Sequence, residues 1–137
     1  MLCPRLSLQP RHAALRNWLG QDIQIDDVVF RGARDGNTSN FRLGIVVGTN
    51  EAKKTIRVEW KVEDGYYHSP EREFFKVPGV PYAKVGNLSP NTVFVVDKTV
   101  LDEVLSLREV CERAARDKLP AADFERITGL TREVSRY

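Results

Sequence analysis

DDVVF at residues 26–30, FRLGIVV at 41–47 and KTIRVEWKV at 54–62 are the segments that decide the fold. In the last of them every second residue is apolar, and these residues are Ile56, Val58, Trp60 and Val62. Side chains of a β-strand point alternately to its two faces, so this segment is predicted to bury one face and expose the other. Together the segments predict short strands separated by polar turns, and such a meander can close into a small barrel.

Residues between and within these segments refine the prediction. Because Gly and Asn tolerate positive φ, and Asn and Asp side chains bond to nearby backbone, residues 35–37 and 50–53 are predicted turns. A change of apolar phase predicts a turn or bulge at Asp26-Asp27. The predicted inward set of the second segment is Phe41, Leu43, Ile45 and Val47. Gly44 would lie on the opposite face, where a missing side chain lets the strand bend or another backbone approach.

Three short motifs resemble those of SH3-like barrels of the Tudor and KOW type. They are Asp27-Val28-Val29, Gly44-Ile45-Val46 and Arg57-Val58-Glu59-Trp60. The resemblance covers residues 22–97 and implies a fourth strand at 82–88, a short helical turn at 89–91 and a last strand at 93–96. The fold class it implies is mainly β with helical appendages, built on a five-stranded SH3-like barrel.

Residues 63–81 depart from this pattern, because they are long for the connection of a hairpin. Such loops often form the ligand pocket in Tudor-like barrels, so the resemblance implies a binding role, although it names no ligand. Compact proteins with this kind of barrel are also frequent among phage-encoded accessory proteins, which adds a hypothesis about the origin of the chain.

The chain divides into three predicted parts, which are a basic N-terminal arm at 1–20, the barrel at 21–98 and a helical tail at 99–137. In the arm, a short helix is predicted from Pro10 through Leu19, with Gly20 ending it.

The helical tail carries two helix patterns. A capping-box sequence at 106–109 predicts the start of a helix that Pro120 stops. The residues predicted to form its apolar face are Leu107, Val110, Cys111 and Ala114. A second short helix is predicted at 121–128 with Gly129 ending it, and residues 131–137 are predicted to fray.

The charge of the chain bears on whether the protein binds nucleic acid. The chain has 21 basic and 19 acidic residues, and a protein that binds through phosphate contacts usually shows a clear basic excess. Locally, however, Arg42, Arg57 and Lys61 are predicted to share the outer face of adjacent strands, where they could form a basic patch. The alternative is an ordinary solvated strand face with mixed charge.

Aromatic residues in the 63–81 segment offer further candidates for a binding site. Rings on barrel loops can stack on bases or enclose a cation, and the candidates here are Tyr66, Tyr67 and Phe75. Phe74 and Phe75 are adjacent, so in a strand one would face inward. The alternative is that the segment folds back and its rings cover the open end of the barrel.

No catalytic or metal-binding pattern stands out, and the sequence predicts a protein that is not an enzyme and has no cofactor. Cys3 and Cys111 lie far apart, and no signal peptide or membrane span is predicted, so a cytoplasmic protein is expected, in the host cytoplasm if the chain is viral. The first hypothesis is a protein-interaction or adaptor module that binds a protein partner or itself. The second is a nucleic-acid-binding barrel that uses the basic strand face and the loop aromatics.

Overall fold

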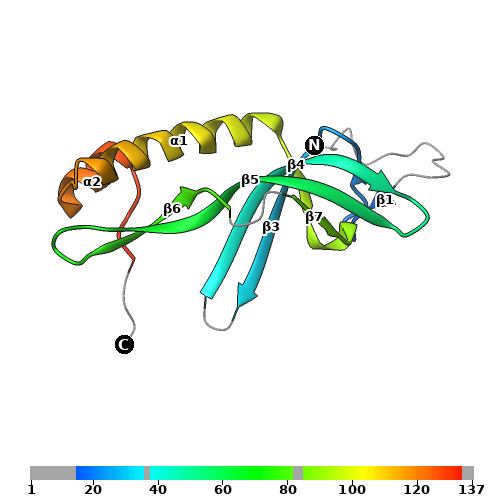
Figure 1. Cartoon of the computed structure of the whole chain (residues 1–137), viewed down its shortest axis with the longest axis horizontal. Coiled ribbons are helices and arrows are strands. Elements are labelled where there is room, and N and C mark those ends of the chain that lie inside the picture. The colour runs from blue at the N-terminus through cyan, green and yellow to red at the C-terminus, as the bar shows by residue number, and fades with distance from the viewer. Residues whose placement is uncertain (1–14, 36–37, 82–84, 134–137) are drawn as a thin grey trace.

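The computed structural model describes residues 15–35, 38–81 and 85–133, which form a mainly β molecule with two helices (Figure 1). The elements are β1 (Leu15–Arg16), β2 (Asp22–Ile23), β3 (Val28–Asp35), β4 (Thr38–Asn50), β5 (Thr55–His68), β6 (Phe74–Gly79), β7 (Val85–Leu88), the 3₁₀ turn η1 (Pro90–Thr92), β8 (Phe94–Val96), α1 (Lys98–Arg116) and α2 (Ala121–Thr128).

The three predicted central strands are confirmed as β3, β4 and β5, and each is longer than predicted. The strand order is β6-β5-β4-β3-β8, with β7 also paired to β5, and the sheet curls into a half-barrel (Figure 1). Within the described chain β7 and β8 are not paired with each other, so no ladder of hydrogen bonds closes a five-stranded barrel. The turn at Asp26, the 3₁₀ turn after Ser89 and the last strand are confirmed.

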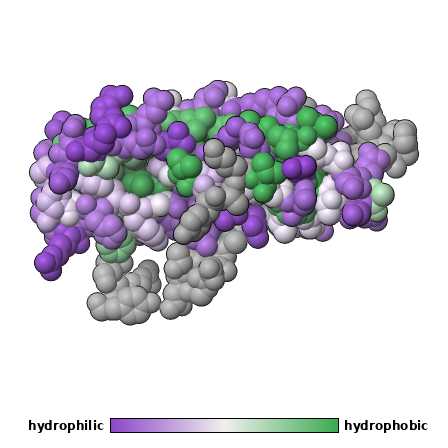
Figure 2. All heavy atoms as spheres, viewed as in Figure 1, coloured by the Kyte–Doolittle hydropathy of each residue, from purple (hydrophilic) through white to green (hydrophobic). Residues whose placement is uncertain are grey.

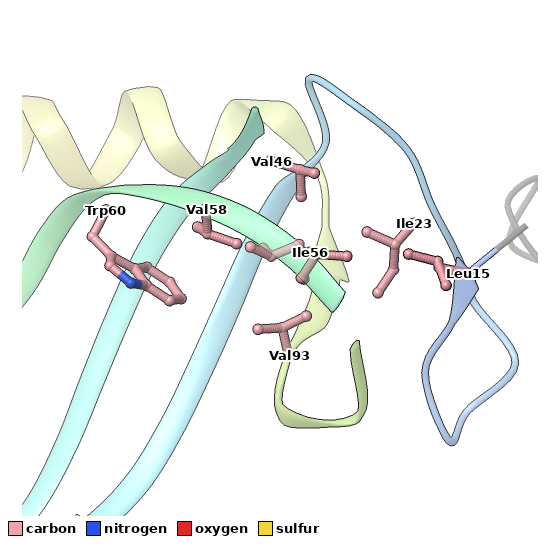
Figure 3. Packing of buried hydrophobic residues seen from close by; sticks show 8 residues of the cluster. Leu15, Ile23, Val46, Ile56, Val58, Trp60 and Val93 are labelled. Atoms are coloured by element: carbon pink, nitrogen blue, oxygen red, sulfur yellow. The ribbon is translucent and has the colours of Figure 1, made fainter. Parts of the chain in front are cut away.

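The alternation in β5 is confirmed, because Ile56, Val58, Trp60 and Val62 are all buried. The first three pack with β1, β2 and the segment around Val93 (Figure 3), whereas Val62 packs with Val28, Leu43 and Leu101. In β4 the predicted inward set is partly wrong, since Val46 is buried while Phe41 and Val47 are 40% and 44% exposed. The pairing with β5 shifts register after Leu43 and after Val46, and each shift changes which residues face the core.

Gly44 belongs to this irregular stretch. It pairs with Trp60 and is buried, so its predicted position on the outer face is wrong. The predicted close approach of another backbone is confirmed, because a Cβ on Gly44 would lie 2.6 Å from the carbonyl oxygen of Glu59.

The predicted loop at 63–81 is wrong, because β5 continues to His68 and forms a hairpin with β6. The N-terminal helix is also wrong over its described part, where Leu15 and Arg16 pair with β2. The Asn17 side chain accepts hydrogen bonds from the backbone N–H groups of Leu19 and Gln21, both at 3.0 Å, which favours a turn. The remainder of the predicted basic arm, at 1–14, lies outside the described residues.

Helix α1 begins much earlier than the capping-box pattern predicts. Asp97 caps it by accepting a hydrogen bond from the backbone N–H of Thr99 at 2.9 Å, and the predicted start at Ser106 falls inside the helix. Cys111 and Ala114 are buried as predicted. Helix α1 lies along the β5–β6 hairpin (Figure 1) and closes a second apolar cluster there.

Helix α2 begins and ends where the sequence predicts, with Gly129 at φ 75° after its last turn. Phe124 is fully buried between Tyr67 and Phe75, at centroid distances of 4.4 and 4.5 Å. Aromatic contacts of this kind anchor the helix to the hairpin. The hydroxyl of Tyr67 donates a hydrogen bond to the carbonyl of Leu119 at 2.6 Å, just before the helix.

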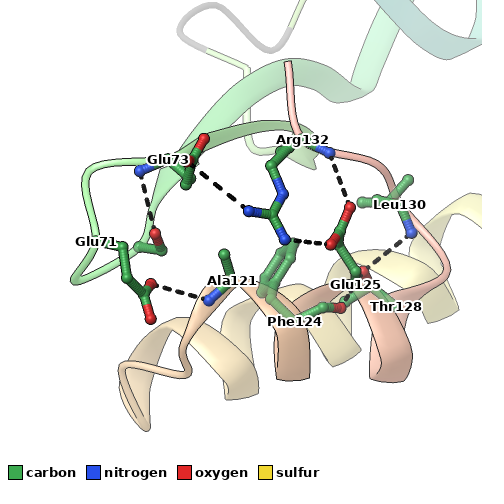
Figure 4. Close-up of polar contacts among 9 residues, drawn as sticks. Glu71, Glu73, Ala121, Phe124, Glu125, Thr128, Leu130 and Arg132 are labelled. Carbon is green, nitrogen blue, oxygen red and sulfur yellow. Dashed lines mark hydrogen bonds and ion pairs between the residues drawn. The ribbon is translucent and has the colours of Figure 1, made fainter. Parts of the chain in front are cut away.

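Two glutamates attach α2 and the segment after it to the rest of the molecule (Figure 4). The Glu71 carboxylate accepts a hydrogen bond from the backbone N–H of Ala121 at 3.0 Å, and Glu125 forms an ion pair with Arg132. The backbone N–H of Glu133 donates to the carbonyl of Phe74 at 2.7 Å, so the prediction of a frayed end is wrong for 132–133, and 134–137 lie outside the described residues.

Acid is expected to loosen the docking of α2. The hydrogen bond from Ala121 lowers the pKa of Glu71 below its ordinary value of 4.5, and the hydrogen bond from Arg132 does the same for the pKa of Glu125. The unfolded chain therefore binds these protons more readily, so the stabilisation is present above about pH 4.5 and is lost as the pH falls through the lower folded-state pKa values.

An acid titration followed through the α2 amide resonances checks this expectation. The double variant Glu71→Gln and Glu125→Gln should lose most of the pH dependence of α2 docking, whereas Glu51→Gln, in an exposed turn, should keep it. If the double variant loosens over the same pH range as the unaltered chain, these two carboxylates are not the groups responsible.

Candidate functional site

A fork in the sheet forms the most distinctive surface feature. Strands β4 and β5 are paired as far as Arg42 and Glu63, and beyond this point β4 continues with β3 while β5 continues with β6 (Figure 1). At the divergence the backbone N–H of Phe41 has no partner on β5 in the ladder. It donates instead to the carboxylate of Asp64 at 2.8 Å, which satisfies the amide where the strands separate.

An apolar groove of about 210 Å³ lies at this fork. The apolar lining of this fork groove comes from four strands and α1. The main lining residues are Phe30, Phe41, Leu43, Val62, Val77 and Val104. Phe30 and Phe41 stack with their ring centroids 5.8 Å apart, which is a favourable contact for the exposed ring of Phe41. Figure 2 shows that apolar side chains gather in separate patches between hydrophilic ones on the face drawn.

Charged residues at the edge of the fork groove are paired with opposite charges. Arg42 forms an ion pair with Glu63, and the Lys76 ammonium lies 3.2 Å from the carboxylate of Asp64. The same ammonium lies 4.6 Å from the centroid of the Phe41 ring, a favourable cation–π contact. The groove therefore has an apolar floor and a rim whose charges largely cancel.

The three predicted basic residues do not form one compact patch. Lys61 forms an ion pair with Glu59, and Arg42 is paired with Glu63. Arg57 lies six residues before Glu63 on β5, so the positions of Arg42 and Arg57 are about 20 Å apart along the sheet. Arg57 lines a different hollow, beside the β4–β5 turn.

The predicted aromatic candidates separate into one surface residue and two core residues. Tyr66 is 47% exposed and lies near Lys76. Because successive side chains of β5 point to opposite faces, the next residue, Tyr67, lies on the other face of the strand. There it is buried with Phe75 against α2. Tyr67 and Phe75 are therefore not available to a ligand in this conformation, because their rings form the core that holds α2.

Sequence reasoning missed Phe41 and Lys76 as site residues. The alternation in 41–47 placed Phe41 inside with Leu43, but Phe41 lies beyond the last β4–β5 pair, so β5 does not cover it. Lys76 belongs to β6, which lies inside the segment predicted to be a loop. The one local signal was the apolar-rich sequence of 74–80, which is compatible with a strand.

Within the ranges 15–35, 38–81 and 85–133 no three His, Cys, Asp or Glu residues are grouped so that they could hold a metal ion. Burial raises the pKa of the Cys111 thiol to about 11, so it is a thiol rather than a reactive thiolate at neutral pH. No helix in the described part of the chain is long and apolar enough to span a membrane.

Comparisons with protein-family models, with curated proteins and with solved structures gave no match for this chain.

Proposed function

We propose that the protein is a non-enzymatic protein-interaction module and that the fork groove is its docking site. The observation that carries the proposal is an exposed apolar groove bounded by paired charges. Apolar surface that remains open to solvent and is rimmed by polar groups is typical of protein-binding sites.

The arrangement of strands supports the resemblance to SH3-like barrels that the proposal includes. Taken without β6, the order is β7-β5-β4-β3-β8, with a 3₁₀ turn directly before the last strand. The β5–β6 hairpin is then an insertion between the third and fourth strands of the barrel. This insertion creates the fork, so the binding site would be specific to this chain rather than general to the fold.

Size and charge indicate what the fork groove accepts. Its volume of about 210 Å³ lies below the roughly 300–1,000 Å³ of ordinary small-molecule sites. It is large enough for one apolar side chain, and its rim offers no net charge to attract an ionic group. The proposed occupant is therefore a large aliphatic or aromatic side chain that another protein inserts as its anchor.

The nucleic-acid alternative has less support at the predicted face. Phosphate binding requires cations that are free to replace counterions, but Arg42 and Lys61 each have an acidic neighbour. Two of the three aromatic candidates are buried. Arg57, the third predicted basic residue, lines the separate hollow beside the β4–β5 turn.

Selection from a displayed library of random peptides tests the docking proposal. The peptides recovered should share a large apolar residue. Phe41→Thr, which removes an exposed lining ring but keeps a good strand former, should weaken their binding about tenfold or more. Tyr66→Thr is the matched control, because Tyr66 is similarly exposed and also lies near Lys76 but does not line the groove.

The control variant is expected to bind the selected peptides within about threefold of the unaltered chain, as is usual for residues outside an interaction hot spot. Recovery of no peptides, or of peptides that bind the Phe41→Thr variant equally well, would contradict the proposal. Sedimentation of the same variants distinguishes binding of another protein from self-association through the groove.

A further inference from the structure

A second hollow lies on the outer face of the sheet beside the β4–β5 turn, and it shares no lining residue with the fork groove. Arg57 on β5 is paired with Gly48 on β4 and with Asn87 on β7, so these three positions form a row across adjacent strands. Asn50 and Thr55 are paired two residues nearer the turn and therefore belong to the same face. The opposite face carries the buried Ile56 and Val58.

The shape of this hollow follows from the local sequence. A register shift between Val46 and Gly48 leaves Val47 without a partner on β5, and such bulges bend a strand and redirect its side chains. Gly48 has no side chain beside Arg57, which leaves the space open. The turn returns Lys53 to the same hollow, whose volume is about 490 Å³, within the range of small-molecule sites.

The charged residues that line this hollow are all basic. Lys53 and Arg57 both line the hollow, no acidic residue lines it, and within the described part of the chain neither cation forms an ion pair. The other polar groups are neutral hydrogen-bonding side chains, among them those of Asn87 and Thr55. This set contrasts with the fork groove, where every charge has a partner.

We infer that the hollow beside the β4–β5 turn binds a phosphate group. Two cations from different segments can contact separate phosphate oxygens, and the planar Arg guanidinium is suited to two-point contacts. Amide and hydroxyl groups supply neutral hydrogen bonds around them. The phosphate could belong to a small molecule or to a nucleic-acid backbone, and the two sources are separated by the choice of probe.

The test is a titration of the ¹⁵N-labelled full chain with inorganic phosphate and, separately, with a short oligothymidylate at low salt. Amide resonances of residues 47–50, 53–57 and 87 should shift with at least one probe. Arg57→Gln should weaken that binding about tenfold, as expected for the loss of a charged hydrogen bond. Arg57 is exposed, so the variant is expected to fold.

Two further variants separate the hollow from general positive charge. Gly48→Leu keeps both cations but fills the space, and it should also weaken binding; a Cβ there meets only the Cβ of Arg57, at an ordinary 3.6 Å. Arg113→Gln, on an exposed part of α1, removes the same charge elsewhere and should leave binding unchanged.

Each outcome decides the inference. Shifts caused by phosphate alone assign the site to a small phosphate-bearing ligand, and shifts caused by the oligonucleotide alone assign it to a nucleic-acid backbone. In the second case Arg57→Gln should also reduce the slope of log affinity against log salt by about 1. No shift at these amides with either probe, or equal binding by the Arg57→Gln variant, would overturn the inference.

Discussion

Replacing Gly44 by alanine is expected to lower the free energy of unfolding by about 3 kcal/mol or more. The added Cβ would lie 2.6 Å from the carbonyl oxygen of Glu59 and 2.8 Å from side-chain atoms of both Trp60 and Val58. The carbonyl belongs to the central strand β5, which is paired on both sides, so it cannot move without disturbing β4 and β7. Urea denaturation followed by far-ultraviolet circular dichroism measures the change.

Gly48→Ala is the matched control for this substitution. It lies on the same strand, also opposite β5, but its Cβ would meet only the Cβ of Arg57 at 3.6 Å. The change at Gly48 is expected to stay within about 0.5–1 kcal/mol. Equal destabilisation by the two variants would show that the close approach at Gly44 is not what the strand requires.

Phe124→Ala is expected to cost about 3–5 kcal/mol, because it removes a fully buried ring from an aromatic cluster. Phe124 contacts Tyr67 and Phe75, which come from the two strands of the hairpin, so the substitution separates α2 from the sheet. Hydrogen exchange should show faster exchange in α2 and β6 than in β3 and β4, whose core contacts lie in other clusters.

Ile127→Ala supplies the comparison within the same helix. Ile127 is 48% exposed, so its truncation should cost about 1 kcal/mol or less. Were Phe124→Ala no more damaging than Ile127→Ala, the aromatic cluster would not be the contact that holds α2 on the hairpin.

The central strands could be predicted because their signals are local. Alternation in 54–62 and the turn residues around Asp26 and Asn50 depend only on neighbouring residues, and the structure follows them. The signal for the end of α2 was equally local, because Gly129 provides the left-handed conformation that terminates the helix.

The elements that were missed depend on contacts distant in sequence. The β5–β6 hairpin buries Tyr67 and Phe75 against helices that begin dozens of residues later, so its own sequence reads as an irregular loop. Leu15 and Ile23 gain their burial from Ile56 and Val93, which favours a hairpin over the helix that local pattern suggested. The start of α1 depends on Asp97, a single capping residue that the stronger-looking pattern at Ser106 obscured.

The same difference between local signals and contacts distant in sequence applies to the residues of the candidate sites. Arg57 was found from the sequence because its place on the outer face follows from alternation. Phe41 was not found, since its exposure depends on the divergence of β4 from β5 directly beside it. A groove that forms between two hairpins has no signature within either hairpin alone.

The most direct measurement for the fork groove is a titration of the ¹⁵N-labelled chain with blocked single amino acids. N-acetyl-tryptophanamide and N-acetyl-leucinamide should shift the amides of Leu43, Val62 and Val77, and N-acetyl-lysinamide should not. The Phe41→Thr variant should lose these shifts. Equal shifts with all three probes, or none at the fork groove, would contradict the proposal that this groove accepts the apolar side chain of a protein partner.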